Sequence, residues 1–166
     1  MDTRISGILF IFSAALLGGL VFYVFNTPVT SGVNEGSIAL DIVAVNSNGT
    51  IFQLSENRGK KIVVEFMTTS CPYCVEELKD IKNLQSRKDV FFVSILLGEG
   101  LTSNDLIEFS NTHSITWFIG TSQKAGVDYK VTAVPTMLVI DSAGVIKYRG
   151  YYTSAEKLES VLNNIG

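Results

Sequence analysis

The chain has 166 residues, a formal net charge of −3 and a hydrophobic content of 46%. It contains no basic patch or run of like charges, so the sequence predicts no nucleic-acid partner. Two cysteines and one histidine are too few for a structural zinc site of two Cys pairs or of a Cys pair and two histidines. The length is sufficient for one domain with a buried core behind an apolar N-terminal segment.

That N-terminal segment has the pattern of a membrane helix. No charged residue lies between Arg4 and Glu35, and the run Ile5–Phe25 would span about 31 Å as a helix, close to the thickness of a bilayer core. We predict an uncleaved single-pass anchor over residues 1–26, with a cleaved signal peptide as the alternative. Because Arg4 precedes the run and no Lys or Arg closely follows it, we expect the rest of the chain on the extracytoplasmic side.

Residues 27–37 are rich in Gly, Ser, Thr and Asn and are predicted to be a linker. Residues 38–166 then form one domain in which apolar runs alternate with amphipathic segments. The expected strands are Ile38–Val45, Thr50–Phe52, Lys61–Met67, Val90–Leu97, Ile115–Ile119, Thr136–Asp141 and Val145–Arg149. The expected helices are Pro72–Arg87, Ser103–Thr112, Gln123–Tyr129 and a last helix that opens with a capping box at Thr153–Glu156 and ends near Asn163. This order predicts an α/β sandwich with a mixed sheet.

Both cysteines lie in the motif Cys71-Pro72-Tyr73-Cys74, between an apolar strand and a helix. Pro72 fits the first helical position, which places Cys71 at or next to the N-cap. Unpaired N–H groups and the positive end of the helix dipole then favour the thiolate of Cys71. Cys74, one turn further, can attack a mixed disulfide formed at Cys71. The motif therefore indicates reversible disulfide exchange.

Two other interpretations of the motif remain open. The pair could be a structural disulfide, or its two thiolates could bind Cu(I). Met67 lies too far upstream for the Met-x-Cys-x-x-Cys pattern of copper carriers. We favour redox chemistry and predict no metal and no cofactor.

Two acidic residues lie near the thiols in the sequence. Glu65 is inside the apolar run before Cys71, where burial would raise its pKa and let it take and return the proton of Cys74. The alternative is an exposed strand charge. Glu77 lies three residues after Cys74, on the same helix face; the alternative is an ordinary solvated helix residue. We include both carboxylates among the candidate catalytic residues.

With Cys-x-x-Cys at the end of a central strand and Val134-Pro135-Thr136 before the final hairpin, the domain resembles thioredoxin. The TlpA/ResA-like branch of membrane-anchored, extracytoplasmic thioredoxins is the closer resemblance. It covers essentially all of residues 38–166. Four stretches carry it: Ile42–Gln53 as an N-terminal hairpin, which ends in the pattern Asn48–Leu54; Lys61–Cys74; Ser103–Ile119 as a central insertion; and Tyr129–Thr136 followed by Val139–Asp141.

The resemblance implies a thioredoxin-like fold and a cis peptide bond before Pro135, packed against the cysteine pair. It implies that Val134, Pro135 and Tyr73 bind substrate. It also places Glu65 at the position of the buried Asp of thioredoxins, and Glu77 in the Cys-x-x-Cys-x-x-Glu pattern of the branch. Ser70 stands where the family usually has Trp, so the surface beside the site is altered.

The sequence therefore predicts a membrane-tethered thiol–disulfide oxidoreductase that reduces or exchanges disulfides of extracytoplasmic proteins. Its expected partners are proteins with disulfides or thiols, a membrane electron donor or acceptor, and the membrane itself through the N-terminal helix. The alternative is a binding module that carries Cu(I), or that binds peptides, with Cys-x-x-Cys as a ligand pair.

Overall fold

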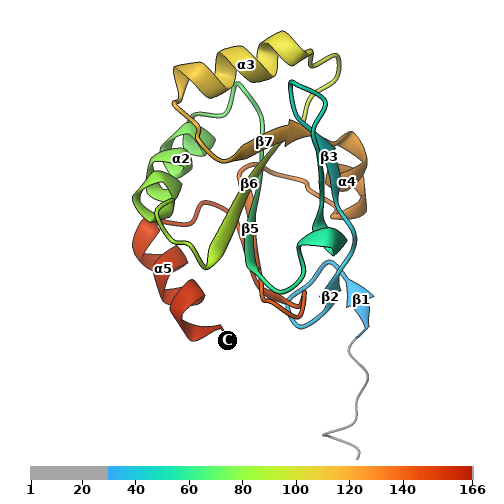
Figure 1. Cartoon of the computed structure of the whole chain (residues 1–166), viewed down its shortest axis with the longest axis vertical. Helices are drawn as coiled ribbons and strands as arrows, with labels where there is room; N and C mark the ends of the chain where they lie inside the picture. The colour runs from blue at the N-terminus through green and yellow to red at the C-terminus, as the bar shows by residue number, and fades with distance from the viewer. Residues whose placement is uncertain (1–29, 166) are drawn as a thin grey trace, which may run out of the picture. The chain divides into compact units, whose positions relative to one another are not determined.

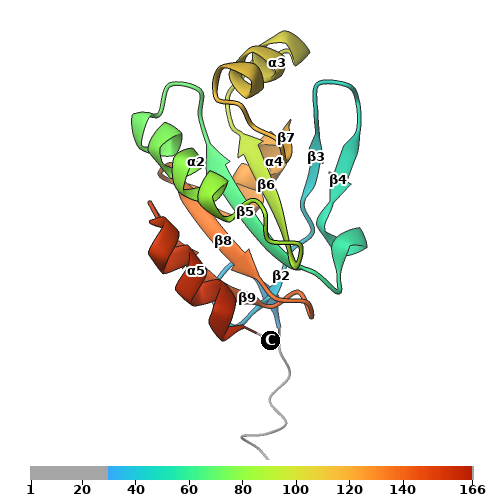
Figure 2. The ribbon, with the colours of Figure 1, turned by 60° about the vertical axis from the view of Figure 1, so that its left-hand side comes forward.

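The computed structural model describes residues 30–165, and Figures 1 and 2 show their arrangement. From Ser31 onward the chain forms one compact unit. The predicted anchor over residues 1–26 lies outside the described residues. Within residues 30–165, no helix is long and apolar enough to cross a membrane.

The domain is built on a mixed sheet of seven strands in the order β4-β3-β7-β6-β5-β8-β9. Strands β5, β6 and β7 are parallel, whereas β3, β4, β8 and β9 pair with antiparallel neighbours. The strands are β3 (Val43–Val45), β4 (Ile51–Gln53), β5 (Lys61–Met67), β6 (Val90–Leu96), β7 (Phe118–Thr121), β8 (Thr136–Ile140) and β9 (Ile146–Gly150). The predicted α/β fold with a mixed sheet is confirmed.

Helices cover both faces of this sheet. Helices α2 and α5 lie side by side on one face, α4 lies on the other, and α3 packs near β7 at the top of both views (Figures 1 and 2). The helices are α2 (Pro72–Leu84), α3 (Ser103–Thr112), α4 (Gln123–Asp128) and α5 (Ala155–Asn164), with a short 3-10 helix, η1 (Leu54–Asn57).

Strand β5 is central and is buried on both faces. Ile62, Val64 and Phe66 join the core on the α4 side. Val63 joins the core under α2 and α5. Because successive side chains of a strand point to opposite faces, Glu65 points to the same face as Val63, toward α2. The strand period therefore places a carboxyl under the helix that carries the cysteines.

The predicted first strand, Ile38–Val45, is two short strands instead of one. β2 (Ile38–Ala39) and β3 are separated at residues 40–42. At this break the Asp41 carboxylate accepts hydrogen bonds from the N–H and the hydroxyl of Ser55. Such side-chain bonds to the backbone compete with ladder pairing. The predicted hairpin between β3 and β4 is confirmed.

The start of one predicted strand and the cap of the last predicted helix differ in the structure. The strand expected from Ile115 begins at Phe118, because the N–H of Ile115 still closes the turn after α3. The last helix is capped by Ser154, whose hydroxyl accepts from the N–H of Lys157. Thr153, the predicted cap, instead donates its backbone N–H to Glu77.

The described end of the predicted linker, residues 30–37, packs on the domain. β1 (Ser31–Gly32) pairs in parallel with β2. The Arg149 guanidinium donates to the carbonyl of Val33, and the Arg149 N–H donates to Glu35. Val33 also packs against the core. The composition predicts a linker here. It gives no sign of this packing, because the contacts are made mostly through the backbone.

We expect a protein that begins at Ile38 to be less stable than one that begins at Thr30. The shorter protein loses the β1–β2 pairing, both hydrogen bonds with Arg149 and two backbone hydrogen bonds with Ile146. At roughly 1 kcal/mol for each of the last four bonds, the free energy of unfolding should fall by about 4 kcal/mol. Urea unfolding followed by circular dichroism measures this difference. Equal unfolding midpoints would show that residues 30–37 contribute nothing to the domain.

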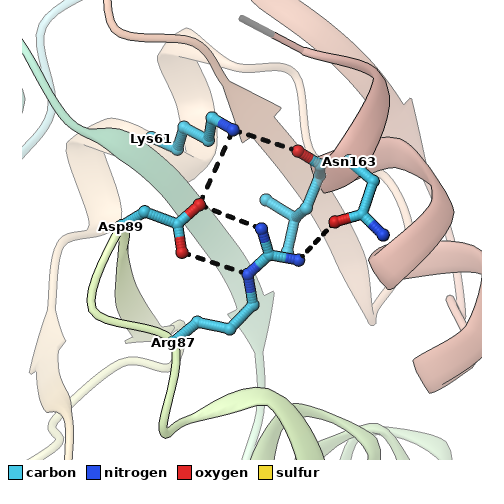
Figure 3. A network of polar contacts seen from close by, with 5 residues as sticks. Lys61, Arg87, Asp89 and Asn163 are labelled. Atoms are coloured by element: carbon cyan, nitrogen blue, oxygen red, sulfur yellow. Dashed lines mark hydrogen bonds and ion pairs between the residues drawn. The ribbon is translucent and has the colours of Figure 1, made fainter.

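A polar network ties the start of β5 and the loop before β6 to α5 (Figure 3). Asp89 accepts two hydrogen bonds from the Arg87 guanidinium and lies 3.6 Å from Lys61 Nζ. Arg87 also donates to the side chain of Asn163, and Lys61 to the carbonyl of Leu162. The hydrogen bonds from Arg87 lower the pKa of Asp89 to about 2. The network lies away from the cysteines and holds α5 against the end of the sheet.

Candidate active site

Cys71 is the N-cap of α2 and directly follows the turn that leaves β5. Its N–H donates to the carbonyl of Thr68, and Pro72 occupies the first helical position. The Sγ atom of Cys71 accepts a hydrogen bond of 3.1 Å from the backbone N–H of Cys74. The helix N-terminus therefore aims a donor at this sulfur, as the sequence predicted, and such donors favour a thiolate.

Cys71 and Cys74 form a disulfide, with Cα atoms 5.3 Å apart. The exposed fraction is 8% for Cys71 and 0% for Cys74. Both pack with Met67 and Leu78 in an apolar cluster at the carboxyl ends of β5 and β6. Only Cys71 can therefore meet a second sulfur from outside.

Both candidate carboxyls are fully buried. The exposed fraction of Glu65, on β5, and of Glu77, on α2, is 0%. Glu77 Oε1 accepts a hydrogen bond of 2.6 Å from the N–H of Thr153. Glu65 Oε2 accepts one of 3.1 Å from the hydroxyl of Ser94. Neither carboxyl is the exposed charge that the alternative interpretation required, although its catalytic role stays a prediction.

The second oxygens of these carboxyls, Glu65 Oε1 and Glu77 Oε2, have no hydrogen-bond donor among the described residues. Burial, and then the charge of Glu77, raise the pKa of Glu65 well above its usual value. Burial also raises the pKa of Glu77 from 4.5 to about 7. The hydrogen bond from the N–H of Thr153 lowers this pKa, but by less than burial raises it. A protonated Glu65 can donate to Glu77, so one shared proton gives both oxygens a partner.

Three groups around this pair were not found from the sequence. Ser94 is a lone polar residue in the apolar strand β6, and its in-register pairing with Glu65 was the usable signal. Trp117 donates its indole N–H to Ser94 Oγ at 2.9 Å. The N–H of Thr153 comes from a segment 76 positions after Glu77. No local pattern connects segments so far apart.

An open apolar groove of about 340 Å³ lies against the Tyr73 end of the motif. The Val134–Pro135 peptide bond beside it is cis, as the resemblance implied. The predicted substrate-binding residues Tyr73, Val134 and Pro135 all line this groove. The other lining residues are Ala133, Tyr151 and Tyr152. The last two were missed, because two exposed tyrosines after a strand look like ordinary surface residues.

His113 takes no part in this site. It is the C-cap residue of α3, and its ring packs on Phe109 with ring centroids 4.4 Å apart. Residues 30–165 contain no group of three or more His, Cys, Asp or Glu side chains that could hold a metal ion.

Comparison with known proteins agrees with this geometry. The Redoxin family profile matches residues 33–165. Thioredoxin-like protein YneN of Bacillus subtilis (strain 168) is 27% identical over 149 residues, which is 86% of this chain and 86% of that protein. Thiol-disulfide oxidoreductase ResA of Geobacillus kaustophilus (strain HTA426) is 28% identical over 138 residues, 80% of this chain and 78% of that protein.

Solved structures share the fold. StoA from Bacillus subtilis aligns with a TM-score of 0.61 and 21% identity, over 74% of this chain and 96% of that chain. A secreted disulfide oxidoreductase of Mycobacterium tuberculosis, homologous to E. coli DsbE, aligns with a TM-score of 0.64 and 18% identity, over 75% and 96% of the two chains. The predicted thioredoxin-like fold is confirmed. The chain belongs to the Redoxin family, as a thiol–disulfide oxidoreductase with a Cys71–Cys74 pair.

Proposed function

We propose that this chain is a membrane-tethered oxidoreductase that reduces or exchanges disulfides of extracytoplasmic proteins. The observation that carries the chemistry is the position of Cys71. It caps α2, its sulfur accepts an N–H, and it is the partly exposed member of a disulfide whose other member, Cys74, is fully buried.

The exchange reaction follows from this asymmetry. In the reduced protein, the Cys71 thiolate attacks one sulfur of a substrate disulfide, and the other substrate sulfur leaves with the electron pair. Cys74 then loses its proton and attacks Cys71 Sγ, which forms the protein disulfide and releases the second substrate thiolate. Two electrons pass to the substrate, and its two thiolates take up two protons. The reverse sequence oxidises a substrate dithiol.

The groove beside the motif suits an extended segment of a protein substrate. The backbone N–H and C=O of Val134 have no backbone partner among the described residues, so they can pair with such a segment. Tyr73 and Tyr151, with exposed fractions of 70% and 63%, both line this groove. Aromatic rings of this kind supply contact area at low cost in side-chain entropy.

The tether and the extracytoplasmic location rest on the sequence. The uncharged run Ile5–Phe25 and the placement of Arg4 support them. Disulfides persist outside the cytoplasm, where such an enzyme has substrates. The structural relative from Mycobacterium tuberculosis is a secreted protein, which is consistent with chemistry outside the cell.

Two assays test the chemistry, and two more test the location. The reduced domain should catalyse insulin reduction by dithiothreitol, and a Cu(I) titration should show no binding tight enough to compete with a thiol chelator. Tight 1:1 copper binding without insulin reduction would favour the carrier.

For the location, the full chain should stay in the membrane at alkaline pH, and its domain should be cleaved by protease added to intact spheroplasts. Protection from the protease would contradict an extracytoplasmic domain.

Tyr151→Ala tests the groove. We expect KM for a protein disulfide to rise several-fold, because one wall of the groove is lost, while the rate with a small aromatic disulfide stays unchanged. Val127→Ala is the matched control, because Val127 is 76% exposed and lies on α4. If KM is the same for the wild type and both variants, the groove does not bind the substrate.

A further inference from the structure

A line of hydrogen bonds connects Trp117 to Glu65 through Ser94. Trp117 Nε1 donates to Ser94 Oγ at 2.9 Å, and Ser94 Oγ lies 3.1 Å from Glu65 Oε2. The indole is a donor only, so the hydroxyl accepts from it and has its own proton left for Glu65. Ser94 and Glu65 are both fully buried and lie opposite each other on β6 and β5. The direction of each bond is therefore fixed.

The other carboxyl of the pair is held independently. Glu77 Oε1 accepts a hydrogen bond of 2.6 Å from the N–H of Thr153. Glu77 Oε2, like Glu65 Oε1, has no hydrogen-bond donor among the described residues. The charged groups that act on the pair are Asp80, on the same helix as Glu77, and the two carboxyls themselves. Among the described residues, no Lys or Arg contributes to either pKa. Two buried negative charges without a cation are costly, so a proton stays between them.

We propose that Ser94 and Trp117 are positioning residues of the exchange reaction. They hold Glu65 in an orientation in which it shares one proton with Glu77. Glu77 lies one helical turn after Cys74 on α2. This inference rests on the proposed exchange function. When Cys74 attacks Cys71 Sγ, its S–H bond breaks and the pair accepts the proton on Glu77. When the protein disulfide is reduced again, the pair returns that proton to the Cys74 sulfur.

The reaction of the reduced protein with 5,5′-dithiobis(2-nitrobenzoic acid) separates the two steps. The first release of thionitrobenzoate reports attack by Cys71, and the second reports attack by Cys74. The rate of the second phase should rise with pH through one inflection that belongs to the carboxyl pair. The first phase should follow the ionisation of Cys71 alone.

Ser94→Ala removes a donor to Glu65 and frees its carboxyl to turn away from Glu77. Glu77 then loses the hydrogen bond from Glu65 that lowers its pKa, so the inflection of the second phase, in which Glu77 takes the proton, should move to higher pH by about 0.5–1 unit, as expected for one hydrogen bond. Trp117→Phe should shift it in the same direction by less, because the hydroxyl keeps its bond to Glu65. Ser94→Thr keeps the hydroxyl and should restore the wild-type inflection.

Thr121→Val is the matched control, because it removes a hydroxyl on β7 that donates to the carbonyl of Leu96. It should leave the inflection in place even if the protein is less stable. Unmoved inflections in both Ser94→Ala and Trp117→Phe would overturn the proposal and leave these residues a packing role. Absence of any second phase in the wild type would instead contradict the exchange function.

A second readout needs no activity. Trp117 is the only tryptophan, so its fluorescence reports the environment of Ser94. In the oxidised protein, the emission should titrate with a midpoint near neutral pH, and Glu77→Gln should move or abolish that midpoint. Wild-type emission that stays constant from pH 5 to 9 would show that Trp117 is not coupled to the carboxyl pair. It would overturn the proposal even if none of the variants folds.

Discussion

Replacing Cys74 by serine should trap Cys71 in a stable mixed disulfide with a protein substrate, whereas Cys71→Ser should abolish exchange and trap nothing. Cys71 is the sulfur that receives an N–H at the helix N-terminus and keeps an exposed fraction of 8%. Cys74 is fully buried, so a substrate disulfide cannot reach it. Without Cys74, the mixed disulfide has no internal thiol to resolve it.

Non-reducing gels of the tagged protein, isolated from cells or mixed with an oxidised model substrate, measure the trapped adducts. Steady-state insulin reduction should fall to the uncatalysed rate in both single variants. The double variant, Cys71→Ser with Cys74→Ser, is the control for adducts that form outside the site. Adducts that appear with Cys71→Ser and not with Cys74→Ser would reverse the two roles.

The parts of the fold with strong local patterns were predictable. The apolar run Lys61–Met67 and the capped segment Ser103–Thr112 have the predicted bounds. In each case one local signal decides the element, either burial on both faces or a capping box with apolar spacing. The cysteine motif was predictable for the same reason, because strand, proline and helix follow one another directly.

The surroundings of the cysteines depend on distant pairings, which local patterns do not encode. Ser94 meets Glu65 only because β6 pairs with β5 in one register. Thr153 looked like a helix cap until the fold placed its N–H against Glu77. The position of Ser31–Gly32 depends on backbone pairing with β2, to which side-chain composition gives no clue.

Glu77→Gln should change both the stability of the protein and the rate of the second exchange step. The pKa of Glu77 is raised from 4.5 to about 7 by burial, so the folded protein binds this proton more tightly than the unfolded chain. The stabilisation is complete below about pH 4.5 and is lost as pH rises through about 7. The full difference corresponds to about 3 kcal/mol as an upper limit. Glu65, whose pKa is also raised, acts with the same sign.

Glutamine keeps an oxygen for the N–H of Thr153 and adds an amide N–H that can donate to Glu65. Oxidised Glu77→Gln should therefore match the wild type in unfolding free energy near pH 4 and exceed it at pH 8. Its second exchange phase should be slower by about 10²-fold, since a general base is lost. Urea unfolding at several pH values, beside the two-phase kinetics, measures both effects.

Glu76→Gln is the control for the last two measurements, because Glu76 lies next to Glu77 on α2 but is exposed and pairs with Lys79. It removes the same charge without touching the buried pair, and should follow the wild type in stability and in rate. Other carboxylates also make the unfolding free energy depend on pH. Asp89, for example, has a lowered pKa, so its contribution to stability is lost as the pH falls. This contribution is the same in the wild type and in each variant, and it cancels when their unfolding free energies are subtracted. If the unfolding free energies of Glu77→Gln and the wild type run parallel from pH 5 to 8, Glu77 is ionised in the folded protein throughout. It would then not be the group that takes the proton of Cys74.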